Sequence, residues 1–167
     1  MAASVTYTPI SSYTFATAAA NYTFSSIPST YTDLVLVANC KNTVGATYGL
    51  LLQYNSDTGS NYSSTLLWGN GTSALSGRYT TQYNAMFMGW AGSTNFSPIV
   101  INIQNYANTT TYKTAISRSS DSGDRVAAMV SLWRATPAAI NSITVSFEPS
   151  ANIAAGSILS LYGIAAA

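Results

Sequence analysis

Three strand-like runs lie in the last quarter of the chain: Val126-Ala-Ala-Met-Val-Ser-Leu-Trp-Arg134, Ile140-Asn-Ser-Ile-Thr-Val-Ser-Phe-Glu148 and Ser157-Ile-Leu-Ser-Leu-Tyr-Gly-Ile164. In the middle run apolar and polar residues alternate, which is the period of two that buries one face of an antiparallel strand. In the first and third runs residues of both parities are apolar, as in Val130 beside Met129. We therefore expect these two strands to need cover on both faces, from a second sheet or a second subunit.

Strand signals continue through the rest of the chain, and no run of eleven or more residues has the 3.6-residue period of a helix. Residues 5–8 predict a short first strand that Pro9 ends, residues 13–15 and 22–24 a possible pair, and residues 75–83 a loop or an edge strand. Further strands are predicted at 33–39, 48–54, 64–68, 85–90, 97–105 and 112–118. The prediction is an all-β, two-layer antiparallel β-sandwich.

The length of the chain favours one domain over residues 1–167, in which residues 1–30 form an N-terminal edge strand or arm that contributes to assembly contacts. Only 7% of the residues are charged, against about 25% in an ordinary globular domain. With a formal net charge of +1, the chain has no field to attract a polyanion, so nucleic acid is not an expected partner. Its polarity comes from Ser, Thr, Asn and Tyr, which suit surfaces buried against another protein.

Cys40 is the one cysteine, so no intramolecular disulfide forms, and its place after the apolar run 34–38 predicts a buried, inert thiol. Synthesis in a reducing cytosol is the expectation. The first residues have neither a basic region nor a long apolar region, so we expect no secretory signal. No apolar run approaches the length of a membrane span, and a membrane is not an expected partner.

Catalytic chemistry has few candidates because the chain contains no His. This count excludes Ser-His-Asp and Cys-His catalysis and the usual zinc sites. A pair of carboxylates remains, and the five acids are Asp33, Asp57, Asp121, Asp124 and Glu148. Asp121 and Asp124 share a loop with Arg118 and Arg125, where local ion pairing is favoured over a glycosidase pair. We expect no enzyme and no cofactor.

One loop has the spacing of a calcium site. Asn55, Asp57, Gly59 and Asn61 place oxygen donors at every second residue, but the closing bidentate Glu is missing and Leu66 stands at that position. A plain turn is favoured, and calcium stays open as the alternative. A second hypothesis makes a sugar-binding platform of the rings at positions 62, 68, 79 and 83. Packing of these rings in a core or a subunit interface is favoured over it.

Three segments carry a resemblance to a known family: Asn55-Ser-Asp-Thr-Gly-Ser-Asn-Tyr62, Ser131-Leu-Trp-Arg134 followed by Ala139-Ile-Asn-Ser-Ile-Thr144, and Ala155-Gly-Ser-Ile-Leu-Ser-Leu-Tyr-Gly-Ile164. Together they resemble a recurrent β-sandwich module of tailed-bacteriophage virion proteins. The resemblance implies a jelly-roll-like fold, self-association typically as a homotrimer, and a place on the particle exterior.

From this resemblance we expect a capsid decoration (cement) protein, a viral structural protein made in the host cytoplasm that binds the major capsid protein on the outside of the virion. The alternative is a tail-fibre or receptor-binding module that recognises a host surface glycan. The expected contact residues lie on the first strand and in the Tyr-rich loops: Val5, Tyr7, Asn61, Tyr62, Tyr79 and Tyr83.

Overall fold

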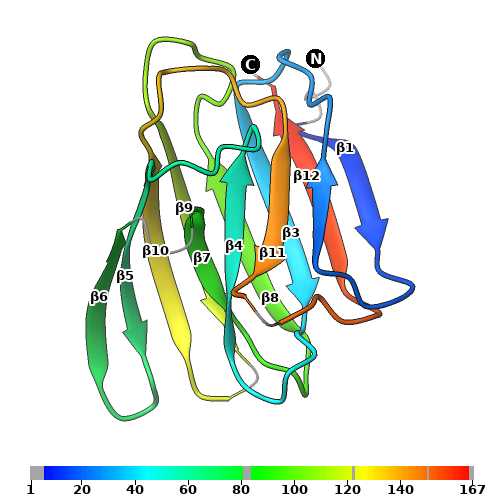
Figure 1. Cartoon of the computed structure of the whole chain (residues 1–167), viewed down its shortest axis with the longest axis vertical. Helices are drawn as coiled ribbons and strands as arrows, with labels where there is room; N and C mark the ends of the chain where they lie inside the picture. The colour runs from blue at the N-terminus through cyan, green and yellow to red at the C-terminus, as the bar shows by residue number, and fades with distance from the viewer. Residues whose placement is uncertain (1–5, 81–83, 122, 150, 166–167) are drawn as a thin grey trace.

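The computed structural model describes residues 6–80, 84–121, 123–149 and 151–165, which form twelve strands in two antiparallel sheets (Figure 1). Within these residues no helix is long and apolar enough to cross a membrane. The larger sheet has the order β1 (Tyr7–Thr14), β12 (Ile158–Ile164), β3 (Asp33–Cys40), β8 (Ser97–Ile103), β9 (Lys113–Ser120), β10 (Val126–Trp133), β5 (Tyr62–Gly69) and β6 (Ala74–Thr80). The smaller sheet has the order β2 (Asn21–Phe24), β11 (Ile143–Phe147), β4 (Tyr48–Tyr54) and β7 (Met86–Ala91).

The strand pairing follows the jelly-roll pattern. Strands β1·β12 and β3·β8 pair in the larger sheet, while β2·β11 and β4·β7 pair in the smaller one. Successive strands thus cross between the layers as one folded ribbon. Two hairpins, β5–β6 and β9–β10, are inserted after β4 and β8 and extend the larger sheet beyond β8. The two-layer β-sandwich and its jelly-roll likeness are therefore confirmed.

The main core lies between the two sheets and follows from the period of two in each strand. Leu36 of β3 pairs with Leu161 of β12 and with Ile101 of β8, and all three side chains are buried. The smaller sheet contributes Leu50 and Leu52 from β4 to the same cluster. Burial of Cys40 at the end of β3 raises the pKa of its thiol to about 12, which keeps it protonated and unreactive.

A second cluster lies where the β5–β6 extension reaches β7. It joins Leu66 and Met129 of the larger sheet to Phe87 and Trp90 of β7. The edge of β7 is closed by two hydroxyl groups, because Phe87 N donates to Ser64 Oγ (3.0 Å) and Ser131 Oγ donates to Phe87 O (3.1 Å). One strand from each inserted hairpin, β5 and β10, therefore covers an edge of the smaller sheet that would otherwise be open.

The first strand differs from its prediction, because β1 continues through Pro9 to Thr14. Strand β1 is an edge strand, and its register with β12 shifts between Pro9 and Ser11, so the missing N–H interrupts no regular ladder. The predicted pairing of residues 13–15 with 22–24 is also wrong, since β1 and β2 belong to different sheets. Their rings still meet across the layers, and Tyr13 stacks on Tyr22 at 4.1 Å between ring centroids.

Candidate functional site

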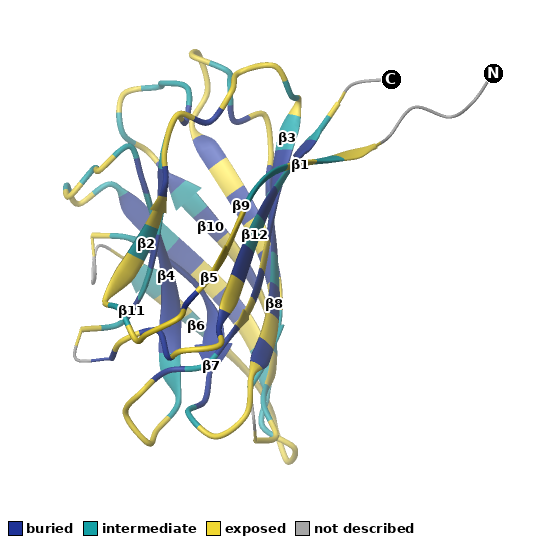
Figure 2. Cartoon of the chain, turned by 90° about the vertical axis from the view of Figure 1, so that its right-hand side faces the viewer, coloured by how far each residue is buried: buried dark blue, intermediate teal, exposed yellow. Residues whose placement is uncertain are grey.

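The side chains of the larger sheet that point away from the smaller sheet form a surface that we call the outer face. Figure 2 shows buried and exposed residues alternating along these strands. Four apolar side chains of the outer face are strongly exposed, namely Leu67 (62%), Val126 (61%), Val130 (54%) and Ile116 (46%). The second sheet covers only the inner face of β10, so of the two sources of cover that the sequence leaves open, a second sheet does not supply it for the outer face.

The strand register gathers these side chains into one area. Ile116 of β9 lies opposite Val130 of β10. In the next row, Arg118 lies between Val100 of β8 and Ala128 of β10. Ala128 in turn lies opposite Leu67 of β5. Residues that are far apart in the sequence thus form a continuous, mostly aliphatic surface across β8, β9, β10 and β5.

Two hollows interrupt the outer face, one on each side of Arg118. The larger hollow, of about 690 Å³, is lined by small residues and by apolar walls: Leu67, Trp68, Gly69, Ala74, Leu75, Ser76, Arg118, Ser119, Val126, Ala127 and Ala128. The smaller one, of about 240 Å³, is lined by Pro98, Val100, Arg118, Ser119 and Ser120. Small side chains at the middle of a sheet leave space that a protruding apolar group of a partner can fill.

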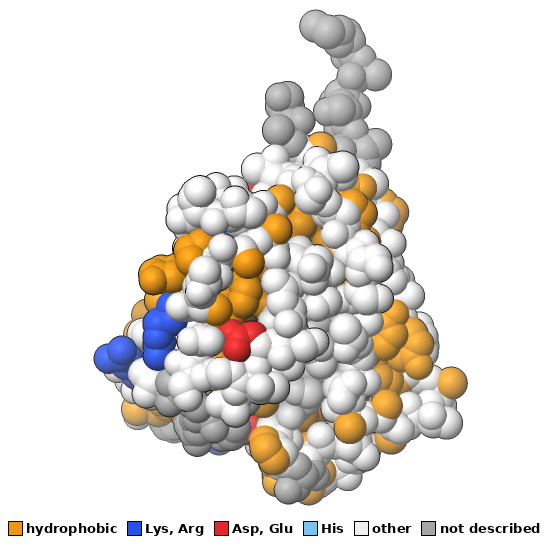
Figure 3. All heavy atoms as spheres, turned by 45° about the horizontal axis from the view of Figure 1, so that its top comes forward, with side chains coloured by type: hydrophobic (Ala, Val, Ile, Leu, Met, Phe, Trp, Pro, Cys, Tyr) orange, Lys and Arg blue, Asp and Glu red, His pale blue; other side chains and the backbone are white. Residues whose placement is uncertain are grey.

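Charge is scarce on the molecule, and Figure 3 shows the few charged atoms of one view gathered on one side among uncharged surface. No carboxylate is among the described residues that line either hollow. The ion pair found among the described residues joins Arg125 to Asp121 at 4.0 Å, within their own loop, as the sequence predicts. Arg118 is thus an exposed guanidinium in an apolar surround, available to a carboxylate or a carbonyl group of a partner.

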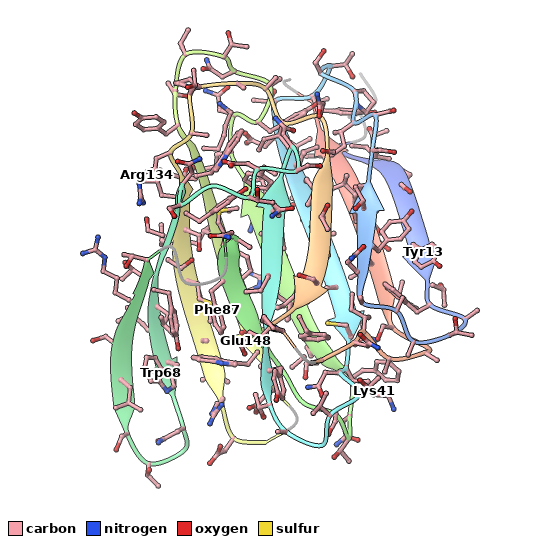
Figure 4. All side chains as sticks on the ribbon, in the orientation of Figure 1. Tyr13, Lys41, Trp68, Phe87, Arg134 and Glu148 are labelled. Atoms are coloured by element: carbon pink, nitrogen blue, oxygen red, sulfur yellow. The ribbon has the colours of Figure 1, made fainter. Side chains whose placement is uncertain are left out.

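The six predicted contact residues do not form one site. Val5 and Tyr83 lie outside the described residues. Tyr7 is exposed at one edge of the larger sheet and lies edge-on to Tyr162, whereas Tyr79 is half-buried on the opposite edge strand and stacks on Phe87 at 4.9 Å. Figure 4 shows the same separation for the labelled rings of Tyr13 and Trp68.

The expectation for Tyr62 is wrong, because its ring is fully buried at the start of β5. Its hydroxyl accepts a hydrogen bond from Tyr54 N (3.2 Å) and donates one to Asp57 O (3.0 Å). Trp68 points to the inner side and packs against Trp90, with ring centroids 5.6 Å apart. The structure therefore places two of the rings of the hypothetical sugar platform in or beside the core, as the favoured packing reading predicts.

The loop with calcium-like spacing is a hydrogen-bonded turn. Asp57 Oδ1 accepts from Gly59 N (2.8 Å), and Asp57 Oδ2 accepts from Trp133 Nε1 (2.6 Å) and from Asn61 Nδ2 (2.9 Å). The amide oxygen of Asn55 accepts from the backbone of residues 141 and 142. The side-chain oxygens of Asn55 and Asp57 thus already accept N–H donors. Within the described part of the chain, no group of three His, Cys, Asp or Glu residues could hold a metal.

The same loop forms a polar hollow of about 550 Å³ that sequence reasoning missed. Asp57 and Asn61 meet Trp133 and Arg134, which lie more than seventy residues away along the chain. No spacing in the sequence indicates this contact, because it depends on the pairing of β5 with β10. Burial alone would raise the pKa of Asp57, but the hydrogen bonds from Trp133, Asn61 and Gly59 outweigh it and lower the pKa.

Replacing Asp57 by Asn should reduce the free energy of unfolding by about 2 kcal/mol at neutral pH, because the amide offers Trp133 and Asn61 a donor in place of an acceptor. The pKa of Asp57 is lower in the folded chain than in the unfolded one. The carboxylate therefore stabilises the fold above about pH 4, and this contribution disappears as the pH falls through the folded pKa. Urea unfolding of both proteins from neutral to acidic pH measures it. A difference that stays constant down to the lowest pH would contradict this assignment.

Three other carboxylates also accept hydrogen bonds from backbone N–H groups. Asp121 Oδ1 accepts from Gly123 N and Arg125 N, and Glu148 Oε2 accepts from Gly49 N at 2.6 Å. Asp33 Oδ1 accepts from Asn105 N. Each of these groups closes a turn or a strand end, which is a structural use of a carboxylate.

Comparison with protein-family models gives no match, and comparison with curated proteins gives none either. Among solved structures, the chain is similar to the mouse laminin alpha1 chain, domains LG4-5. The TM-score is 0.36 and the identity 11%, over 88% of this chain and 40% of that chain. This chain therefore spans less than half the length of the laminin structure. At this level the likeness says nothing about function, and the fold assignment rests on the strand order.

Proposed function

We propose that this protein is a structural protein of a phage virion, a capsid decoration protein that binds the major capsid protein as a homo-oligomer and stabilises the head. The observation that supports the proposal is the outer face, where Leu67, Ile116, Val126 and Val130 are exposed together on a chain with few charges. Contiguous exposed apolar surface on a folded protein marks an interaction site. Jelly rolls occur in both capsid and lectin domains, so the surface and not the fold carries the argument.

The composition of the outer face fits a protein partner better than a sugar. Its strongly exposed members are aliphatic and mostly β-branched, whereas sugars are bound by aromatic rings beside convergent polar groups. An interface of standard size buries about 800 Å² on each partner, and its centre is apolar with few charges. A stretch of four neighbouring strands carrying such residues matches that description.

Immunogold labelling of intact virions with an antibody to the folded protein tests the proposal. Label spread evenly over the head is the expected result. Label confined to the tail or its tip would overturn the decoration role and favour the receptor-binding alternative, in which the polar hollow at Asp57 and Arg134 becomes the candidate glycan site.

Binding to particles should depend weakly on salt, because burial of aliphatic side chains is not screened by ions. Particles washed at about 1 M salt, where the Debye length is about 3 Å, should keep the protein, as measured by gel densitometry of the sedimented particles. Release at high salt that is reversed at low salt would show that charges hold the complex, and would contradict an apolar interface.

A further inference from the structure

A sandwich of two sheets has four edge strands, which here are β1, β6, β2 and β7. Three of them have a feature that hinders pairing with a strand of another molecule. Strand β7 is closed by the hydroxyls of Ser64 and Ser131, β2 has only four residues, and β1 carries Pro9 beside a break in register. These are common devices against edge-to-edge pairing. Strand β6 has none of these three features, and its one charged residue is Arg78. It has seven residues without Pro or Lys, and it pairs with β5 in unbroken register along its whole length.

The hydrogen-bond pattern of the hairpin shows which backbone groups of β6 are left over. Asn70 N donates to Ser73 O at 3.2 Å and closes the β5–β6 hairpin. Because bonded and non-bonded pairs alternate along an antiparallel ladder, Leu75, Gly77 and Tyr79 bond to β5. The N–H and C=O groups of Ala74, Ser76 and Arg78 then point away from β5, along the free edge.

We propose that β6 pairs with β6 of a second copy of this chain, antiparallel and centred on Gly77. This register pairs residues 75–79 of the two copies with each other and places Ser76 opposite Arg78 of the second copy. Both residues have outward-facing backbone groups, so each such pair exchanges two hydrogen bonds. A two-fold contact of this kind is closed, because each strand offers the other the same surface.

The side chains of β6 favour this register over its neighbours. On the inner side, Leu75, which is 40% exposed in the single chain, comes opposite Tyr79 of the second copy, an aliphatic–aromatic cross-strand pair. Centring on Arg78 would place two guanidinium groups opposite each other. Centring on Ser76 would place Leu75 opposite Gly77, which has no side chain to pack, and would shorten the overlap. Gly77 at the centre also lets the two backbones approach without crowding.

The pairing joins two existing features of the molecule. Ala74, Leu75 and Ser76 line the larger hollow of the outer face. In the dimer, the larger hollow of one copy and that of the second copy therefore lie on either side of the two-fold axis. The inference is independent of the proposed capsid role, because it concerns only the contact between copies. It predicts a dimeric unit, in contrast to the trimer that the phage resemblance implies.

Replacing Ser76 by Pro tests the pairing, with Ser76→Ala as the matched control. Proline removes an N–H that faces the free edge and leaves the ladder to β5 intact, whereas alanine keeps the N–H. Sedimentation equilibrium of the full chain should show a dimer whose dissociation constant rises about a hundredfold in Ser76→Pro and hardly changes in Ser76→Ala. A monomer at all concentrations, a trimer, or a dimer that both variants preserve would overturn the proposal.

Hydrogen exchange of the unmodified protein gives a second measurement, which does not depend on the folding of the proline variant. At low and high protein concentration the amides of Leu75, Gly77 and Tyr79 should be equally protected, because β5 binds them in both states. The amides of Ser76 and Arg78 should become protected only at high concentration. If they exchange equally fast at both concentrations, β6 is not the contact and the proposal fails.

Discussion

Replacing Gly49 by Ala is expected to lower the free energy of unfolding by about 3 kcal/mol, the largest stability effect that we predict for a one-carbon change in this protein. The Cβ atom of an alanine at position 49 would overlap the ring of Phe87 on the neighbouring strand β7. In most strands such a change is mild, because a glycine in a strand usually weakens it. Here the ring occupies the space above the glycine.

Phe87 cannot move away to relieve this overlap. Its ring is buried, stacks on Tyr79 and lies edge-on to Trp90, with centroids 5.3 Å apart. Its backbone N–H and C=O are held by Ser64 and Ser131. Movement of the ring would therefore open the second cluster as well as the edge of β7, and both costs add to the steric one.

Gly163→Ala is a matched control for this prediction. A Cβ atom there would overlap the ring of Tyr31, but Tyr31 is only half-buried and lies before β3, where it can turn outward. We expect a loss of about 1 kcal/mol at that position. Thermal and urea unfolding of both variants measure the difference. Equal losses, or an unchanged melting temperature for Gly49→Ala, would show that Phe87 is not held as tightly as its contacts indicate.

Replacing Val130 by Lys is expected to weaken binding to virions about a hundredfold while changing the free energy of unfolding by less than about 0.5 kcal/mol. Val130 is 54% exposed on the outer face and lies beside Ile116, so a lysine there reaches solvent in the free protein. In a complex that buries the outer face, the same ammonium group would lose its water without gaining a partner, and would come close to Arg118.

Thr23→Lys is the matched control, because Thr23 is exposed on β2 of the smaller sheet, on the opposite side of the sandwich. Cosedimentation with stripped particles should show normal binding for Thr23→Lys and loss of binding for Val130→Lys, both with native circular dichroism spectra. Equal binding of the two variants would mean that the outer face is not the surface that contacts the capsid.

Local sequence pattern predicts most strands of this fold. The alternation of Ile99, Ile101 and Ile103 with polar or smaller residues fixes β8, and the same holds for β11. Apart from the extent of β1, the errors concern the partners of strands rather than the strands themselves. Residues 13–15 and 22–24 have matching patterns, yet they pair with β12 and β11, because strand choice depends on the path of the whole ribbon. For residues 75–83 the sequence pattern is compatible with a loop or an edge strand. The structure shows a strand over residues 74–80, which pairs with β5.

The candidate site is predicted less well. The apolar residues of both parities in β10 predict cover on both faces; the structure shows one face buried under the smaller sheet and the other exposed. Which strands join β10 in the outer face does not follow from periodicity. The aromatic residues predict contact sites less well, because the burial of a ring depends on its tertiary position. Tyr62 is buried, and its hydroxyl donates to Asp57 O inside the fold.

The place of β12 between β1 and β3 has a consequence for biosynthesis. Among the described strands β12 is translated after all the others, and it is an inner strand of the larger sheet, so β1 has no neighbour in that sheet until residues 158–164 have been made. Such long-range pairing makes folding slow, and apolar strands stay unpaired and exposed in the nascent chain until their partner is translated. A stop codon shortly before β12 should therefore yield an aggregating product, and a folding reporter fused downstream of residue 165 would respond only to chains that have completed the sheet.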